Sequence, residues 1–178
     1  VYNFVDPSRY AFEENVADDA PFVFLGRLDK IKGCHHCIEL AKKLNHKLII
    51  AGNISELPHE KAYFENEIKP HIDGELITYI GSVNDEQKSE LLGNAKALLM
   101  LIDWDEPFGI VMAEALACGT PILGFARGAI KEVVQHGVNG IIIPDLANAD
   151  AILSDIKSIS RAKCREVQEK RCDITPIA

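Results

Sequence analysis

The stretch from Asp103 to Pro121 (DWDEPFGIVMAEALACGTP), together with the apolar run just before it, restricts the fold more than any other part of the chain. The run Ala97 to Ile102 (ALLMLI) contains no polar side chain, which indicates a strand that is buried on both faces. A polar break follows, and the pattern then predicts a helix from about Phe108–Gly109 to Cys118, with Gly119 as its stop. A buried strand followed by a buried helix is typical of an α/β protein with a parallel sheet.

Glu114 is the single charged side chain in this predicted helix, and an unpaired buried charge is costly. One interpretation makes Glu114 a structural carboxylate that pairs with one of the 19 basic side chains. The other interpretation makes Glu114 a ligand-binding residue. It starts from the free N–H groups of Phe108, Gly109 and Ile110, which form an anion site at the start of the helix. Glu114 lies roughly 7 Å further along the axis, within reach of a ribose attached to a phosphate bound there.

A second group of charged residues lies in the loop from Gly26 to Gly33 (GRLDKIKG), between a predicted strand and a predicted helix. Arg27 offers a bidentate fork to phosphate oxygens, and Lys32 offers a point charge. Solvated surface cations are the alternative interpretation of these residues, and we assign Lys30 to the surface. The fingerprint Gly-x-Gly-x-x-Gly is absent from this loop, which removes the main support for a nicotinamide or flavin site.

Two glutamates, Glu106 and Glu114, are separated by seven residues in EPFGIVMAE and are followed by Ala115, Gly119 and Pro121. This pattern resembles the signature of the retaining glycosyltransferases of family 4. The Gly26–Gly33 loop resembles the Gly-Arg…Lys-Gly loop of the same family. The resemblance covers nearly everything up to about residue 170. It implies the two-domain GT-B fold, a nucleotide-sugar donor and a transfer reaction.

The resemblance also implies roles for individual residues. Arg27 and Lys32, beside Gly26, would hold the donor diphosphate together with the amide groups at the start of the Gly109 helix. Glu114 would accept the ribose hydroxyls. Cationic side chains and amide dipoles aimed at the leaving diphosphate would stabilise the transition state more than the ground state.

Further implied roles concern the sugar and the base. Glu106 would face the sugar ring, either as a catalytic residue or by positioning a sugar hydroxyl. Ser82 and Val83 would line the base pocket, although a plain strand-to-helix turn explains them equally well. The donor would be a UDP-, GDP- or ADP-sugar, and transfer would require no cofactor and no metal.

Short apolar runs alternate with helical patterns along the whole chain, which predicts a doubly wound, mostly parallel, six-stranded Rossmann-like sheet. We expect residues 1–21 to be an interdomain linker and entry segment, and residues 22–178 to form the nucleotide-sugar-binding domain. The expected strands are Phe22–Gly26, Lys47–Ala51, Leu76–Ile80, Ala97–Ile102, Ile122–Phe125 and Gly140–Pro144. The expected helices are 33–44, 60–71, 85–94, 128–135, 149–159 and 161–170, the last of them charged and peripheral.

By the resemblance, an N-terminal acceptor-binding domain of the same enzyme would be the missing partner. We therefore expect the isolated chain to bind donor with little or no transfer. A length of 178 residues with 47% hydrophobic residues suits one domain that buries roughly 70% of its unfolded surface. A net charge of −8 argues against broad binding to nucleic acid or anionic membranes.

Other features of the sequence concern the compartment and metals. No apolar run approaches the roughly 18 residues of a membrane span, and the first residues of the sequence do not show the charged-then-apolar pattern of a signal segment. Five cysteines in a chain with an adequate core favour the reducing cytoplasm, and peripheral membrane association of the full enzyme is compatible with this. The run Cys34-His35-His36-Cys37 suggests zinc, but an ordinary helix turn is favoured. Asp103 and Asp105 could suggest Mg²⁺, but their geometry is unspecified.

Two other functions are kept as alternatives. The chain could be a nucleotide-binding module without transferase activity, in which Arg27, Lys32 and Glu114 bind a ligand and Glu106 is dispensable. It could also be another GT-B enzyme, such as a nucleotide-sugar epimerase or a phosphorylase. A phosphorylase would need a lysine-bound pyridoxal cofactor, for which the sequence shows no signature.

Overall fold

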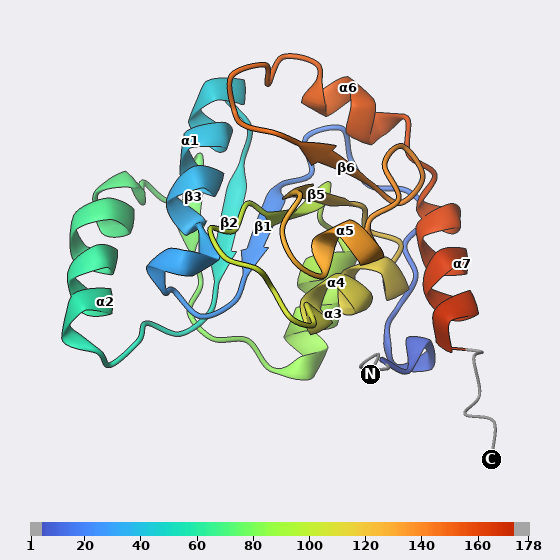
Figure 1. The fold of residues 1–178 in the computed structure, drawn as a ribbon, viewed down its shortest axis with the longest axis horizontal. Coiled ribbons are helices and arrows are strands. Elements are labelled where there is room, and N and C mark those ends of the chain that lie inside the picture. The colour runs from blue at the N-terminus through green and yellow to red at the C-terminus, as the bar shows by residue number, and fades with distance from the viewer. Residues whose placement is uncertain (1–4, 173–178) are drawn as a thin grey trace.

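The computed structural model describes residues 5–172, which form an α/β domain around one parallel sheet (Figure 1). Residues 1–4 and 173–178, which fall within the predicted linker and domain, lie outside the described part. All six sheet strands coincide with predicted apolar runs, and their order is β3-β2-β1-β4-β5-β6. The strands are β1 (Phe22–Leu25), β2 (Leu48–Ala51), β3 (Ile77–Tyr79), β4 (Ala97–Met100), β5 (Ile122–Phe125) and β6 (Gly140–Ile143).

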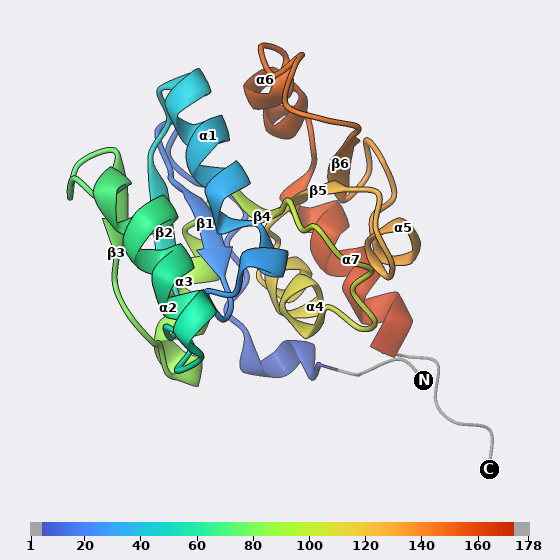
Figure 2. The same cartoon turned by 60° about the vertical axis from the view of Figure 1, so that its left-hand side comes forward.

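Helices cover both faces of this sheet, as a doubly wound fold requires. α1 and α2 lie against one face, and α3, α4 and α7 lie against the other (Figure 2). The helices are α1 (Cys34–Leu44), α2 (Pro58–Tyr63), α3 (Asp85–Gly93), α4 (Ile110–Ala117), α5 (Ile130–Val133), α6 (Ile152–Lys157) and α7 (Arg161–Cys172). Because each face is covered, the central strands are apolar on both sides. Every residue of β4 is buried.

The central strands pair in register across the middle of the sheet. Val23 of β1 lies between Ile49 of β2 and Leu98 of β4, and both pairings are parallel. Parallel strands need crossover connections, and each crossover here carries at least one helix. The carboxyl ends of all six strands therefore meet at one edge, where the connecting loops gather.

The segment from 60 to 71 differs from the single helix that its pattern predicts. Helix α2 continues as a π-helical turn at Phe64–Ile68 and ends in a 3₁₀ turn at Lys69–His71. Pro70 explains the end of the helix, because it has no N–H group and its ring clashes with the carbonyl of the preceding turn. The predicted apolar stripe is nevertheless correct, since Tyr63, Phe64 and Ile68 are buried.

Helix α3 begins at Asp85, as the sequence predicts, and its cap is the residue before it. Asn84 is its N-cap: the Asn84 side chain accepts from the Gln87 amide, and the Gln87 side chain accepts from the Asn84 amide. This reciprocal capping box satisfies two of the free donors at the start of the helix.

Helix α7 is not peripheral, contrary to its charged sequence. It packs against α4, and Arg161, Cys164 and Gln168 are buried along one side. The Arg161 guanidinium donates to the carbonyls of Glu13, Ala95 and Gly93. In the described part of the chain, no helix is both long and apolar enough to cross a membrane.

Candidate functional site

A cavity of about 390 Å³ opens at the carboxyl edge of the sheet, between the ends of β1 and β4. These neighbouring strands send their chains to opposite faces, which makes this edge the topological switch point where open α/β sheets bind ligands. Arg27 and Lys32 line the cavity from the loop after β1, together with Gly26. Glu106 lines it from the loop after β4, and Phe108 to Val111 line it at the start of α4.

Arg27 is oriented by an acidic neighbour that the sequence analysis did not single out. The guanidinium of Arg27 forms an ion pair with the Asp29 carboxylate. The Asp29 side chain is 6% exposed, whereas that of Arg27 is 58% exposed. The buried Asp29 therefore anchors the guanidinium, while the rest of the Arg27 side chain stays open to solvent beside the cavity.

Lys32 and Glu106 contact each other directly. The Lys32 ammonium lies 2.9 Å from Oε2 of Glu106 and 4.8 Å from the centre of the Trp104 ring. Oε1 of Glu106 accepts a longer hydrogen bond, 3.4 Å, from the amide of Gly109. The carboxylate thus bridges the cationic loop and the amino end of α4. A diphosphate bound at this position would share Lys32 and the Gly109 amide with Glu106.

The start of α4 offers further backbone donors. Gly109 adopts a left-handed conformation (φ 60°), and no side chain caps the helix from that position. The N–H groups of Ile110 and Val111 have no acceptor within the helix, because they belong to its first turn. Free amide groups and the positive end of the helix dipole suit an anion. Phe108 and Ile110 are exposed large apolar residues beside this end.

Glu114 is buried in the same helix but does not line the cavity. Its Oε1 accepts from the Tyr10 hydroxyl and from the Lys88 ammonium, each at 2.9 Å. Burial and the Glu114 carboxylate raise the pKa of Tyr10, so the phenol stays protonated as a donor. Lys88 is the basic partner that the structural interpretation of Glu114 requires. The ribose role of Glu114 stays a prediction.

Ser82 and Val83 lie apart from the cavity. They belong to the loop between β3 and α3, and β2 separates β3 from β1 in the sheet. Ser82 is exposed, and neither residue lines the cavity. The structure therefore brings together Gly26, Arg27, Lys32, Glu106 and the start of α4, but not Ser82, Val83 or Glu114.

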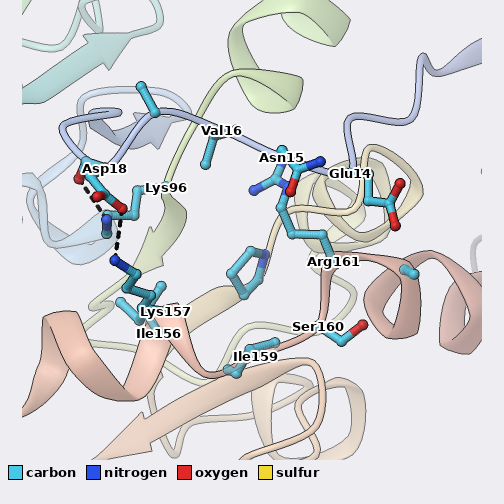
Figure 3. Close-up of a pocket in the computed structure, with 13 residues that line it drawn as sticks. Glu14, Asn15, Val16, Asp18, Lys96, Ile156, Lys157, Ile159, Ser160 and Arg161 are labelled. Atoms are coloured by element: carbon cyan, nitrogen blue, oxygen red, sulfur yellow. Dashed lines mark hydrogen bonds and ion pairs between the residues drawn. The ribbon is translucent and has the colours of Figure 1, made fainter.

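A second hollow, of about 420 Å³, lies at the opposite edge of the sheet, before the amino ends of β4 and β5 (Figure 3). Its cations already have partners. Lys157 pairs with the Asp18 carboxylate at 2.9 Å, and Lys96 donates to the Asp18 carbonyl at 2.7 Å. The guanidinium of Arg161 is held by backbone carbonyls. This hollow also lies at the amino ends of the strands, whereas open α/β sheets bind ligands at the carboxyl ends.

Asp29, Trp104, Tyr10 and Lys88 are the site neighbours that sequence reasoning missed. Asp29 had a local signal, because it follows Arg27 by two residues in the same loop. Tyr10 and Lys88 gave no such signal, since they are 104 and 26 residues from Glu114 in the sequence. Only the packing of the N-terminal segment and α3 against α4 brings them to the Glu114 carboxylate.

The strand order and the site together define a Rossmann-like α/β domain whose carboxyl edge suits an anionic ligand. Residues 9–174 match the family described as Glycosyl transferases group 1. The chain belongs to this family.

Similar curated proteins are consistent with membership of this family. An uncharacterized glycosyltransferase of Methanocaldococcus jannaschii is 29% identical over 87% of this chain and 44% of its own length. The N-acetyl-alpha-D-glucosaminyl L-malate synthase of Bacillus anthracis is 27% identical over 80% of this chain and 39% of its own. The chain thus spans less than half the length of these relatives.

Solved structures show the same fold. HepE of Anabaena, in complex with UDP-glucose, superposes with a TM-score of 0.77 at 20% identity, over 97% of this chain and 53% of that one. The C-terminal domain of LpcC, a group 1 family protein from Francisella tularensis, superposes with a TM-score of 0.72 at 18% identity. That match covers 96% of this chain and 100% of the other. The sheet is therefore that of a GT-B glycosyltransferase domain.

Proposed function

We propose that this chain is the donor-binding domain of a retaining glycosyltransferase and that the cavity at the switch point binds a nucleoside diphosphate sugar. The observation that carries the proposal is that Arg27, Lys32 and the amino end of α4 line one cavity. HepE, which shares the fold, was solved with UDP-glucose. An N-terminal domain would hold the acceptor, as the twofold greater length of the relatives suggests. The setting of the full enzyme would be cytoplasmic.

In this proposal the protein supplies the positive charge that the reaction needs. Breaking the bond between the anomeric carbon and the phosphate oxygen leaves a nucleoside diphosphate with growing negative charge. Arg27, Lys32 and the amides of α4 are aimed at that charge, so they stabilise the transition state more than the ground state. Glu106 pairs with Lys32, so its carboxylate would lie beside the same phosphate and would face the sugar. No divalent metal is required for this charge neutralisation.

The ribose role of Glu114 is compatible with its contacts. Tyr10 and Lys88 both donate to Oε1. Within residues 5–172 no donor reaches the other oxygen, Oε2, which could accept the hydroxyls of a ribose. We propose that Tyr10 and Lys88 hold the carboxylate charged and oriented for this purpose.

Calorimetric titration with UDP, GDP and ADP tests the diphosphate contacts. We expect Arg27→Ala to weaken binding of the preferred nucleotide by about 1.5–3 kcal/mol, the usual size of a charge-assisted contact. Lys30→Ala is the matched control, because Lys30 lies in the same loop but its ammonium pairs with Glu67. The control should change affinity by less than about 0.5 kcal/mol. Equal effects of the two substitutions would show that general charge, and not an Arg27 contact, determines binding.

Release of nucleoside diphosphate by the full-length enzyme tests the transferase role. We expect Glu106→Gln to lower kcat by more than about tenfold while nucleotide binding is retained, because Glu106 would act on the sugar and the cationic groups for the diphosphate stay in place. An unchanged kcat would favour the alternative of a nucleotide-binding module in which Glu106 is dispensable.

A further inference from the structure

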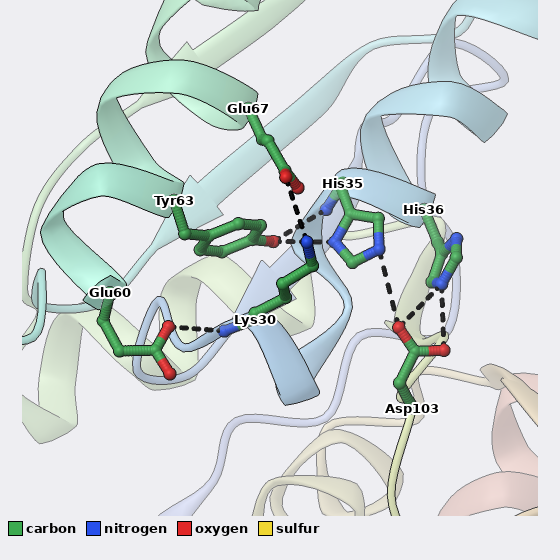
Figure 4. A network of polar contacts seen from close by, with 7 residues as sticks. All are labelled: Lys30, His35, His36, Glu60, Tyr63, Glu67 and Asp103. Atoms are coloured by element: carbon green, nitrogen blue, oxygen red, sulfur yellow. Dashed lines mark hydrogen bonds and ion pairs between the residues drawn. The ribbon is translucent and has the colours of Figure 1, made fainter.

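Two histidines and an aspartate form a compact cluster on the outer side of the same sheet edge (Figure 4). His35 and His36 lie in the first turn of α1, and Asp103 follows the end of β4. Nε2 of His36 lies 3.0 and 2.9 Å from the two carboxylate oxygens of Asp103. Nε2 of His35 lies 3.5 Å from Oδ2 of the same carboxylate. One ligand atom from each residue falls within 4.8 Å of the others.

The backbone holds this cluster together. Gly33, at φ 73°, packs so closely on the end of β4 that an added Cβ would lie 1.8 Å from the Leu101 carbonyl oxygen. The amide of Asp103 donates to the Ile31 carbonyl at 2.9 Å. The start of α1 and the end of β4 are therefore joined as one unit. The side chains of His35, His36 and Asp103 project from this unit.

His35 already has the outer contact that is typical of a metal ligand. Its Nδ1 lies 2.9 Å from the Tyr63 hydroxyl, which also accepts from the His35 backbone amide at 3.2 Å. A hydrogen bond at Nδ1 fixes the ring orientation, in which Nε2 lies on the side of Asp103.

The neighbouring cysteines are not part of the cluster. Cys34 and Cys37 are fully buried in the core on the inner side of α1. Burial raises the pKa of both thiols, that of Cys37 to about 12, so neither is an available thiolate. The side chains of His35, His36 and Asp103, by contrast, are 24%, 25% and 41% exposed. An ion on them could keep water in its remaining positions.

We propose that His35, His36 and Asp103 form a binding site for a divalent transition-metal ion of the Zn²⁺ type. Two imidazole nitrogens and one carboxylate suit Zn²⁺, Co²⁺ or Ni²⁺, whereas Mg²⁺ and Ca²⁺ prefer oxygen ligands alone. The ion would replace the hydrogen bond between His36 and Asp103, and the neutral His36 would then carry its hydrogen on Nδ1. The bound ion would link α1 to the end of β4. The site is separate from the diphosphate contacts of Arg27 and Lys32 in the proposed function.

Titration with Co²⁺ alone, without nucleotide, tests the site on the purified chain. We expect d–d absorption bands without a thiolate charge-transfer band, and displacement of Co²⁺ by Zn²⁺. His36→Gln and Asp103→Asn should each weaken Co²⁺ binding by at least about tenfold, as expected for the loss of one ligand. His59→Gln is the control, because the His59 side chain is 73% exposed and lies outside the cluster. The His59→Gln variant should bind Co²⁺ with the same affinity as the unaltered chain.

A second measurement does not depend on any variant folding. In the unaltered chain, Co²⁺ should shift or broaden the imidazole NMR signals of His35 and His36 but not those of His59 or His136. Binding that persists in His36→Gln and Asp103→Asn, an intense thiolate band, or effects on His59 equal to those on His36 would each overturn the proposal. Nucleotide titrations in the presence of a chelator test the donor site independently, so failure of one proposal leaves the other intact.

Discussion

At the scale of single residues, the carboxylate of Glu114 has the partners that the structural interpretation of this residue requires. A charge inside an apolar helix needs a partner, and Lys88 and Tyr10 supply one. Both contacts are made by Oε1, and among the described residues no donor reaches Oε2. A structural pair and a binding residue are therefore compatible at this position.

Glu114→Gln separates the two roles. The substitution keeps an acceptor for Tyr10 but leaves Lys88 without its partly buried counter-charge. We expect a loss of about 1–3 kcal/mol in the free energy of unfolding, measured by urea denaturation, below the full cost of breaking a buried pair because the Lys88 side chain is 22% exposed.

Ligand binding provides the second readout for Glu114. If Glu114 holds the ribose, the unaltered chain should prefer UDP to its 2′-deoxy analogue, and Glu114→Gln should remove that preference. A preference that survives in the variant would leave Glu114 with its structural role alone.

At the scale of elements, the strands were predictable and the helix boundaries less so. Runs such as Ala97 to Ile102 can only be buried between two layers, which is why every predicted strand is present. Pro70 ended the helical segment that continues from α2, and Asn84 capped α3, through local chemistry that the sequence contained but the apolar pattern did not reveal. Helix α7 was predicted to be peripheral because most of its residues are charged or polar. One side of the helix is nevertheless buried.

Gly33 joins two elements, and its substitution tests that junction. Gly33→Ala should destabilise the chain by both left-handed strain and a clash with the Leu101 carbonyl. Gly74→Ala is a matched control, because Gly74 has nearly the same φ (76° against 73°) but no atom within 4 Å of an added Cβ.

The difference between the two glycine variants isolates the clash. We expect Gly74→Ala to cost about 1–2 kcal/mol from backbone strain, and Gly33→Ala to cost about 1–3 kcal/mol more from overpacking. The free energy of unfolding from urea denaturation measures both. Equal losses would mean that α1 does not depend on its close contact with β4.

At the scale of the whole molecule, Arg161 joins parts of the chain that are distant in sequence. Its guanidinium binds carbonyls of the N-terminal segment, of α3 and of the turn before β4, as well as the Thr120 hydroxyl before β5. Burial lowers the pKa of Arg161, but the guanidinium keeps its charge because its ordinary value is so high. These contacts tie α7 and the N-terminal segment to the sheet.

Arg161→Met should therefore be among the most damaging substitutions outside the apolar core. Several buried carbonyls would lose a charged donor, and we expect a loss of about 3–5 kcal/mol in the free energy of unfolding. Lys163→Met in the same helix is the control, because Lys163 makes only an exposed pair with Glu166, and it should cost less than about 0.5 kcal/mol. Thermal and urea denaturation give both values. A small loss at Arg161 would show that apolar packing alone holds α7 in place.

The sequence by itself determined the layer architecture and the cationic loop with its partner helix. Apolar periodicity follows from the need to bury side chains, and the loop residues Arg27 and Lys32 lie beside strand ends whatever the detailed packing. Only the tertiary structure decided which side chains meet: Lys32 with Glu106, Glu114 with Tyr10 and Lys88, and His35 and His36 with Asp103. Such contacts form between segments that are distant in the sequence, and local sequence patterns do not predict which of these segments come together.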